Sequence, residues 1–292
     1  MLASSLQSCQ NRVEIPDGAI YPILFGSTET RAVADLDDLK SNGFKVYAYF
    51  KGNQGSSSFE KNVIYSSTQE VWGFQTPEYW IPGTTYNFKA FYPAVLSAGT
   101  LTVDQSESTQ NFTIEKFDVV NHQVDIMVAS PDAHVVPEGA TVPESGSVVN
   151  LTFQHLLACI EVQMKSAISN VSITKITLEN ADNNATYKDG TWTAADSGDI
   201  EIEPEDGGLS SSEDKSITNG GILVIPGESS GKSFKIETNI NKTYRVNIPE
   251  ITWVKGNKYT YTAEIKQNNI IFNEPNVDEW DSENATGSVI IK

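Results

Sequence analysis

Apolar and polar side chains alternate along most of the chain. Between residues 44 and 50, for example, Phe44, Val46 and Ala48 share one face of an extended segment, and their neighbours share the other. A period of two is typical of β-strands, and the β-branched and aromatic residues in these runs favour strands as well. Clusters of Gly, Asn, Asp, Pro and Ser separate the runs. The predicted strands are 19–26, 44–50, 62–67, 85–93, 111–117, 123–130, 148–154, 159–165, 171–180, 222–226, 233–240, 244–249, 258–266 and 285–292.

The spacing of these strands predicts the fold class and the division into domains. Many short strands with only brief helical stretches, such as residues 35–41, indicate an all-β protein built from β-sandwiches. Residues 130–147 carry three prolines and two glycines with little periodicity. We expect this segment to connect two domains, with a long loop inside one domain as the alternative. The expected parts are a leader with the first strand at 1–31, an N-terminal β-sandwich at 32–146 and a C-terminal β-sandwich at 147–292.

The stretch from 148 to 165 predicts a strand that changes direction midway. Phe153 and His155 share one parity, whereas Ile160 and Val162 share the other, so the alternation slips in between. A bulge or bend is expected at this point. His155 is then expected to be a hydrogen-bonded structural histidine, with a ligand or a catalytic base as the alternative.

Net charge and apolar content exclude several classes of protein. The 292 residues include 38 acidic and 20 basic ones, which gives a net charge of −18. Such a surface repels phosphate, so we expect no nucleic-acid partner. A hydrophobic content of 39% is enough for a packed core and argues against a disordered chain. The sequence has no run of 18 apolar residues, so no membrane-spanning helix is predicted.

The sequence patterns that could carry catalysis or bind a metal favour a protein that is not an enzyme. None of the three histidines has a His or Cys at metal-ligand spacing. Residues 227–231 match Gly-x-Ser-x-Gly, but a nucleophile elbow leads into a helix, and residues 233–240 predict a strand. The acidic stretch 199–208 is expected to be a solvated loop, with Ca²⁺ binding as the alternative. We therefore predict no catalytic residue, no metal site and no cofactor.

The five tryptophans leave two interpretations open. Trp72 and Trp80 flank Pro77 and precede the turn Ile81–Gly83, where strands are interrupted. Large aromatic side chains beside such turns usually cap a sandwich core. An exposed, coplanar pair would instead form a platform on which a sugar could stack, so a glycan-binding surface is the alternative.

Cys9 lies in a stretch that resembles the end of a bacterial lipobox. In Ser-Leu-Gln-Ser-Cys-Gln-Asn, Leu6 stands three residues before the cysteine and the small Ser8 directly before it. We expect Cys9 to be acylated and to become the mature N-terminus, with a chance cysteine in a leader as the alternative. The preceding eight residues are too short for a whole signal peptide, so the sequence given is expected to begin late or to be truncated.

An ordered set of segments resembles the fimbrillin-like family, the type V pilins of Gram-negative gut and mouth bacteria. The set covers nearly the whole chain, and the order of its members is more specific than any one of them. Its members, after Cys9, are TRAVADLDDL, GFKVYAYF, YWIPGTTYNFKAFYP, VDIMVAS, FQHLLACIEVQM, GILVIPG, WVKGNKYTYTAEI and NVDEW. The resemblance implies two tandem transthyretin-like β-sandwich domains, export as a lipoprotein, an outer-membrane lipid anchor, and a place in a surface fimbrium that serves adhesion.

The resemblance also implies a way of assembling. Pilins of this family are cut after an arginine in the region of Arg31, so Ala32 would become the new N-terminus and the first strand would be lost. The first strand is apolar on both faces, as a strand buried within a sandwich needs. Its loss would open a groove that a strand from another fimbrial subunit can fill.

The candidate donor is the C-terminal run Val289, Ile290 and Ile291, with pairing inside its own domain as the alternative. Anchor and tip subunits of the family need not be cut, so an uncut Arg31 is a further alternative. Ligands on host or bacterial surfaces are further expected partners. The competing interpretation of the whole chain is a non-polymerising outer-membrane lipoprotein that binds glycans.

Overall fold

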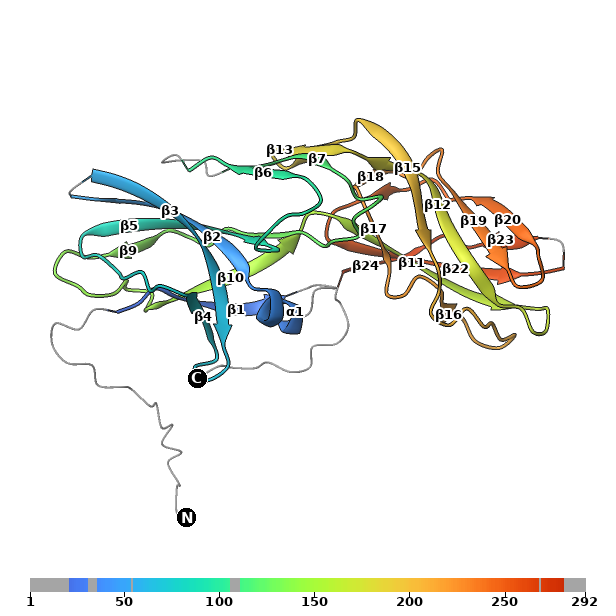
Figure 1. The fold of residues 1–292 in the computed structure, drawn as a ribbon, viewed down its shortest axis with the longest axis horizontal. Helices are drawn as coiled ribbons and strands as arrows, with labels where there is room; N and C mark the ends of the chain where they lie inside the picture. Colours follow the sequence, from blue (N-terminus) through green and yellow to red (C-terminus); the bar gives the residue numbers. More distant parts are fainter. Residues whose placement is uncertain (1–20, 31–35, 54, 106–110, 268, 281–292) are drawn as a thin grey trace, which may run out of the picture.

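The computed structural model describes residues 21–30, 36–53, 55–105, 111–267 and 269–280. Within these ranges the chain is almost entirely β-structure, with one short helix, α1 (Leu36–Asn42). The prediction of an all-β protein with sandwich-like sheets is confirmed (Figure 1). The strands are β1 (Leu24–Thr30), β2 (Phe44–Gly52), β3 (Gly55–Ser66), β4 (Val71–Phe74), β5 (Thr84–Tyr92), β6 (Thr100–Val103), β7 (Phe112–Phe117), β8 (Met127–Ala129), β9 (His134–Val136), β10 (Val148–His155), β11 (Ala158–Ser166), β12 (Ile173–Asn183), β13 (Ala185–Lys188), β14 (Thr191–Thr193), β15 (Asp196–Ile202), β16 (Lys215–Ser216), β17 (Ile222–Val224), β18 (Gly227–Glu228), β19 (Ser233–Thr238), β20 (Thr243–Asn247), β21 (Thr252–Trp253), β22 (Asn257–Ile265), β23 (Ile270–Phe272) and β24 (Asn276–Glu279).

The first large sheet curls over on itself. Its strand order is β2-β3-β4-β1-β10-β8-β5-β9, and a further pairing of β2 with β5 closes the ring. Closure leaves few open edges, which protects a β-protein from unwanted strand pairing. The two sides of the ring enclose a core rich in aromatic rings, including Phe25, Phe44, Phe88 and Phe153.

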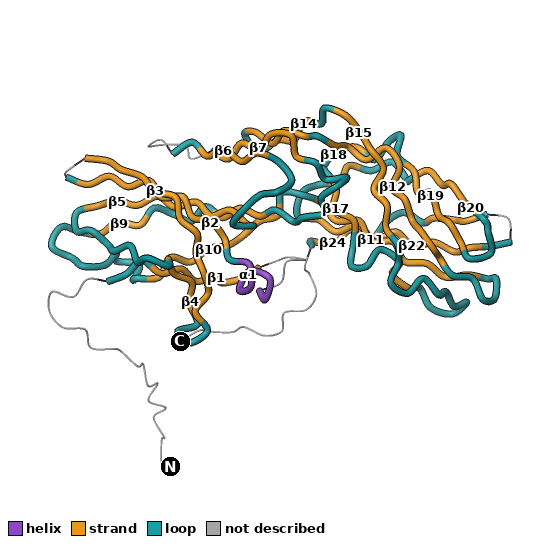
Figure 2. The backbone as a smooth tube through the Cα atoms, viewed as in Figure 1, coloured by secondary structure: helices purple, strands orange, loops and turns teal. Residues whose placement is uncertain are grey.

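The second half of the chain forms a sandwich of its own. One sheet has the order β16-β11-β22-β23, with β17 also on β11 and β24 on β22, and the facing sheet has the order β15-β12-β19-β20 (Figures 1 and 2). Alternating inward side chains of both sheets fill the core between them, among them Val162, Ile176, Phe234 and Tyr261.

A third core cluster lies where the two halves meet. There β6 and β7 of the first half share a four-stranded sheet with β13 and β14 of the second half. Tyr47, Phe117, Leu157 and Tyr187 all belong to this shared cluster. Because both halves contribute to this core, side-chain packing between them, and not a connecting segment alone, holds the sheets in place relative to one another.

The predicted change of strand direction near His155 is confirmed. β10 ends at His155 in the first sheet, and β11 begins at Ala158 in the sheet of the second half. The sheets therefore change over at residues 156–157, whereas the predicted boundary lies at 146/147. β10 lies after the predicted boundary, yet it pairs with β1, which lies before it. The division into domains at 146/147 stays a prediction.

Candidate functional site

The candidate functional site is the seat of the leader strand, β1. β1 lies between two strands of the first sheet, parallel to β10 and antiparallel to β4. Its parallel register runs from Leu24 opposite Val148 to Thr30 opposite Phe153, with an irregularity between Ser27 and Glu29. The strand is therefore an interior member of the sheet, and its backbone groups complete two neighbouring ladders.

Around the start of β1, at residues 22–26, only one face of the chain is fully buried. Ile23 and Phe25 point into the core with exposed fractions of 1% and 0%, whereas Pro22, Leu24 and Gly26 on the other face are half-buried. The expectation that both faces would be buried is thus met on one side only. The outer face lines an open hollow of about 350 Å³ together with β3 and β4. The hollow is open, so the apolar side chains that line it stay partly exposed to solvent.

Phe25 is enclosed by three other phenyl rings. Its ring meets those of Phe44, Phe74 and Phe88 at centroid distances of 6.3, 5.4 and 5.6 Å, and all three contacts are edge-to-face. Aromatic pairs prefer this geometry, since the positive edge of one ring meets the negative face of another. The arrangement makes Phe25 the aromatic anchor of the leader strand.

The residues just before β1 are hydrogen-bonded to a loop that contains Trp80. The amide of Ile23 donates to the carbonyl of Glu78 at 2.7 Å, and the amide of Trp80 donates to the carbonyl of Tyr21 at 3.2 Å. The side chain of Glu78 in turn pairs with Lys61 of β3. Backbone pairing therefore extends from the loop at 78–80 to β4 and continues along the strand.

The sequence-predicted processing and donor residues fall outside the described ranges. These residues are Cys9, Arg31, Ala32, Val289, Ile290 and Ile291. The described elements on either side show where the processing position lies in the chain. β1 ends at Thr30, one residue before Arg31, and α1 begins at Leu36. A cut after Arg31 would therefore release the whole of β1 and no other described strand.

His155 has the structural role that its place at the bend predicts. Its Nδ1 lies 3.0 Å from the carboxylate of Asp125, and both side chains are buried. Sequence reasoning did not find Asp125 as the partner, because thirty residues separate the two and only the pairing of β10 with its neighbours brings them together.

The tryptophans do not form an exposed aromatic platform. Trp72, Trp80, Trp253 and Trp280 are all buried, with exposed fractions of 1 to 4%. Trp192 is half-buried and donates from Nε1 to the carbonyl of Leu156 at 2.8 Å. The interpretation of Trp72 and Trp80 as core residues is confirmed, and neither is exposed as the alternative sugar platform requires.

The Gly-x-Ser-x-Gly match is a structural turn. Ser229 is buried, donates from Oγ to the carbonyl of Pro249 at 2.9 Å and accepts from the amide of Ile251 at 2.8 Å. The strand β19 follows the turn, as predicted, in place of the helix that a nucleophile elbow needs. The hydroxyl of Ser229 therefore ties two loops of the second half together.

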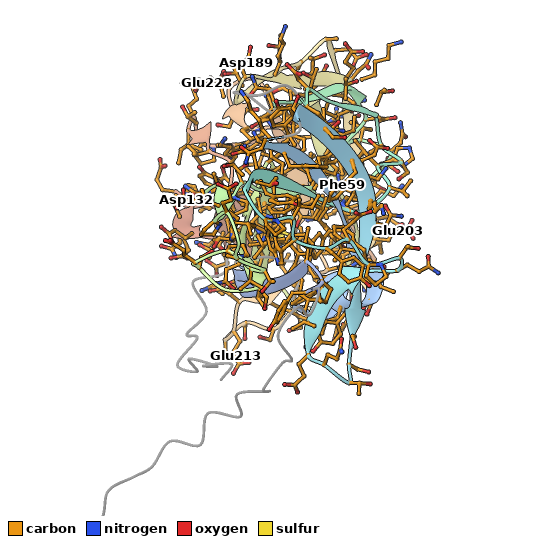
Figure 3. All side chains as sticks on the ribbon, turned by 90° about the vertical axis from the view of Figure 1, so that its left-hand side faces the viewer. Phe59, Asp132, Asp189, Glu203, Glu213 and Glu228 are labelled. Carbon is orange, nitrogen blue, oxygen red and sulfur yellow. The ribbon has the colours of Figure 1, made fainter. Side chains whose placement is uncertain are left out.

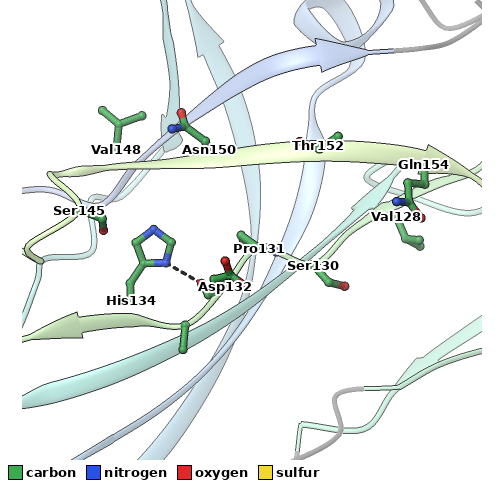
Figure 4. A pocket seen from close by; sticks show the side chains of 11 residues that line it. Val128, Ser130, Pro131, Asp132, His134, Ser145, Val148, Asn150, Thr152 and Gln154 are labelled. Carbon is green, nitrogen blue, oxygen red and sulfur yellow. Dashed lines mark hydrogen bonds between the residues drawn. The ribbon is translucent and has the colours of Figure 1, made fainter.

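A polar hollow of about 500 Å³ lies on the outer side of β10 (Figure 4). Asn150, Thr152 and Gln154 form one wall, and His134 stands opposite with Nδ1 2.9 Å from the carbonyl of Asp132. Burial lowers the pKa of His134 below its ordinary value, so its ring is neutral at physiological pH. The hollow is open, and Asn150, Thr152 and Gln154 in its wall are exposed, which is typical of a solvated surface.

Charges on the described surface fit the acidic composition. Figure 3 shows Asp132, Asp189, Glu203, Glu213 and Glu228 at the periphery of the molecule. Among the residues that the structure describes, no three His, Cys, Asp or Glu side chains gather as metal ligands would. In the same ranges, no helix has the length and apolarity needed to cross a bilayer.

Comparison with known proteins places the chain in a family. Residues 30–280 match the profile of the fimbrillin-like family. No curated protein matches the sequence. Among solved structures, a fimbrial protein from Bacteroides vulgatus is similar with a TM-score of 0.57 and 17% identity, over 88% of this chain and 99% of the other.

Two candidate cell adhesion proteins are similar in fold as well. The one from Bacteroides uniformis has a TM-score of 0.60 and 16% identity, over 89% of this chain and 99% of the other. The one from Bacteroides ovatus has a TM-score of 0.58 and 14% identity, over 91% of this chain and 100% of the other. At these identities the structures support the fold, and the profile match over most of the chain shows the family: this protein is a member of the fimbrillin-like family.

Proposed function

We propose that the protein is a fimbrial subunit that is exported as a lipoprotein, displayed at the outer membrane and assembled by strand exchange to serve adhesion. Membership of the fimbrillin-like family supports a non-enzymatic fimbrial subunit at the cell surface. The lipid anchor at Cys9, the cut between Arg31 and Ala32 and the exchange of strands are the further parts of the proposal.

One observation carries the exchange: β1 fills an interior position of a closed sheet, yet it is the first described strand of the chain. A strand that precedes all the other described strands can be separated from them by a single cut. The segment that would be cut follows Thr30, the last residue in register with β10. Proteases act most readily at positions that lie between regular elements, and Arg31 lies between the end of β1 and the start of α1.

Removal of β1 would leave unpaired backbone groups and exposed apolar side chains, which a replacement strand would cover. The facing edges of β4 and β10 would lose their backbone partners, and unpaired buried backbone groups are costly. The sites of Ile23 and Phe25 would also open, and burial of two such side chains contributes roughly 3–6 kcal/mol. A strand supplied by another subunit restores both the hydrogen bonds and the buried area.

The proposal is tested on the surface of the source bacterium by immunogold electron microscopy. Wild-type cells are compared with an Arg31→Ala strain and with a strain that lacks the protein. We expect gold along surface filaments in the wild type, and an uncut protein that stays with the outer membrane in the variant. Filaments that label equally in the Arg31→Ala strain would refute cleavage at this residue, and label that never lies on a filament would refute the role as a polymer subunit.

A further inference from the structure

The seat of Phe25 remains in the protein when the leader strand leaves. Its three walls are Phe44 of β2, Phe74 of β4 and Phe88 of β5, and none of these strands precedes the proposed cut. The groove left by β1 therefore contains a preformed aromatic seat of the size of one phenyl ring.

Each of the three wall rings also packs on a further aromatic ring. Phe153 packs on Phe44 at 5.2 Å between centroids. Phe59 packs on Phe74 at 5.5 Å, and Trp80 packs on Phe88 at 5.9 Å. Rings that are held by several packing contacts cannot easily move to fill the seat, so a smaller side chain in the seat leaves a cavity rather than a collapsed core.

The position that follows the seat is narrow. A Cβ added to Gly26 would lie 3.1 Å from Oδ1 of Asn150 and 3.2 Å from Cγ1 of Val148, both on the neighbouring strand β10. The two contacts are with side-chain ends, which can shift by a few tenths of an ångström for alanine. A β-branched residue brings a second carbon into the same space and requires a larger shift.

We infer that the groove accepts a strand with an aromatic residue followed by a small one, and that this strand comes from a subunit other than this chain. The inference rests on the proposed exchange of strands and adds which partner is accepted. The chain's own apolar end, Val289-Ile290-Ile291, contains no ring. If this run entered the groove in the same direction as β1, each of its three residues would be followed by a large one, because Ile290, Ile291 and Lys292 are the residues that follow. In the opposite direction, Val289 next to Ser288 would fill the seat with a side chain much smaller than a phenyl ring.

The test measures which peptides the emptied groove accepts. Residues 31–35 are replaced by a site-specific protease sequence, the purified chain is cut, and the leader is separated in denaturant. The remainder is refolded with fluorescent peptides, and their affinity is read by anisotropy and by the melting temperature of the complex. The reference is the leader peptide of residues 19–30, and it is compared with Phe25→Ala, Gly26→Val and a peptide of residues 284–292.

We expect the Phe25→Ala peptide to bind at least about a hundredfold more weakly than the reference, and the 284–292 peptide at least about tenfold more weakly. The matched control is Leu24→Ala, which removes a half-buried outward side chain from the neighbouring position and should change the affinity by no more than about threefold. Affinities of the Phe25→Ala and 284–292 peptides within threefold of the reference would overturn the inference alone. A groove that accepts no peptide, the reference included, would overturn strand exchange and this inference with it.

Discussion

The indole ring of Trp280 stacks on the imidazole ring of His155, with centroids 4.2 Å apart and planes inclined by 16°. His155 ends β10 of the first sheet, and Trp280 follows the last described strand of the second half. The amide of Trp280 donates to the carbonyl of Gly256 at 2.9 Å, which fixes the backbone at the same place. This contact joins the strand beside the leader to the end of the described chain.

Loss of the Trp280 ring should therefore loosen the junction between the halves. We expect Trp280→Ala to lower the free energy of unfolding by about 3–5 kcal/mol, because a fully buried ring leaves a cavity. Trp280→Phe should cost less, since the indole N–H has no hydrogen-bond partner among the described residues. Urea denaturation with circular dichroism measures both. A Trp280→Ala variant as stable as the wild type would show that the stacking does not hold the halves together.

Limited proteolysis tests whether Arg31 is accessible in the native protein. We expect a low dose of trypsin to cut first after Arg31, so that mass spectrometry finds a new N-terminus at Ala32. The Arg31→Ala variant serves as the control and should lose this product only. A first cut within residues 44–93 would contradict the expectation, because that region holds paired strands of the first sheet.

Acylation of Cys9 is tested by metabolic labelling. A fatty-acid analogue should label the protein expressed with a complete export signal, because the stretch around Cys9 resembles a lipobox. Cys9→Ala should abolish the label, while Cys159→Ala, which changes the other, buried cysteine, should keep it. Equal labelling of wild type and Cys9→Ala would rule out this residue as the anchor.

Deletion of residues 287–292 tests the donor role of the C-terminal run. A donated strand is not needed by its own subunit, so we expect a folded monomer with an unchanged melting temperature that, after cleavage, still accepts a strand but no longer donates one, so that polymers do not extend beyond it. The measurements are differential scanning calorimetry and size-exclusion chromatography with the other subunits present. A strongly destabilised monomer would instead assign Val289, Ile290 and Ile291 to a sheet of their own domain.

Glu161 should make the second half sensitive to acid. Burial by itself would raise the pKa of Glu161, but the hydrogen bond and charge of Lys258, with Nζ 2.6 Å from the carboxylate, hold the pKa below its ordinary value. A lowered carboxyl pKa adds stability above the pKa of the unfolded chain, and this stability is lost as the pH falls through the folded-state pKa.

We therefore expect Glu161→Gln to lower the free energy of unfolding by about 1–2 kcal/mol at pH 7 and to matter less below pH 4. Urea titrations at both pH values measure the difference. Glu213→Gln is the control, because Glu213 is exposed on the surface of the second half. A constant effect of Glu161→Gln at both pH values would contradict the assigned ion pair.

Local alternation by itself determined the class of the fold and the behaviour of particular segments. The period of two along residues 44–50 becomes β2, and the slip of parity after His155 becomes the passage from β10 to β11. The alternation after Gly231 predicts a strand in place of the helix of a nucleophile elbow, and β19 is that strand. These features depend on neighbours in the chain, so a single sequence contains them.

Only the tertiary structure decided which segments meet. No local pattern places β1 between β4 and β10, pairs His155 with Asp125, or joins β6 and β7 to β13 in one sheet, because partners in a sheet are chosen by the packing of the whole core. The same reason explains why Leu24 on the outer face is half-buried and Phe25 on the inner face is fully buried, although both side chains are apolar. Burial depends on whether another layer covers a strand, and the walls of the Phe25 seat come from three strands that lie apart in the sequence.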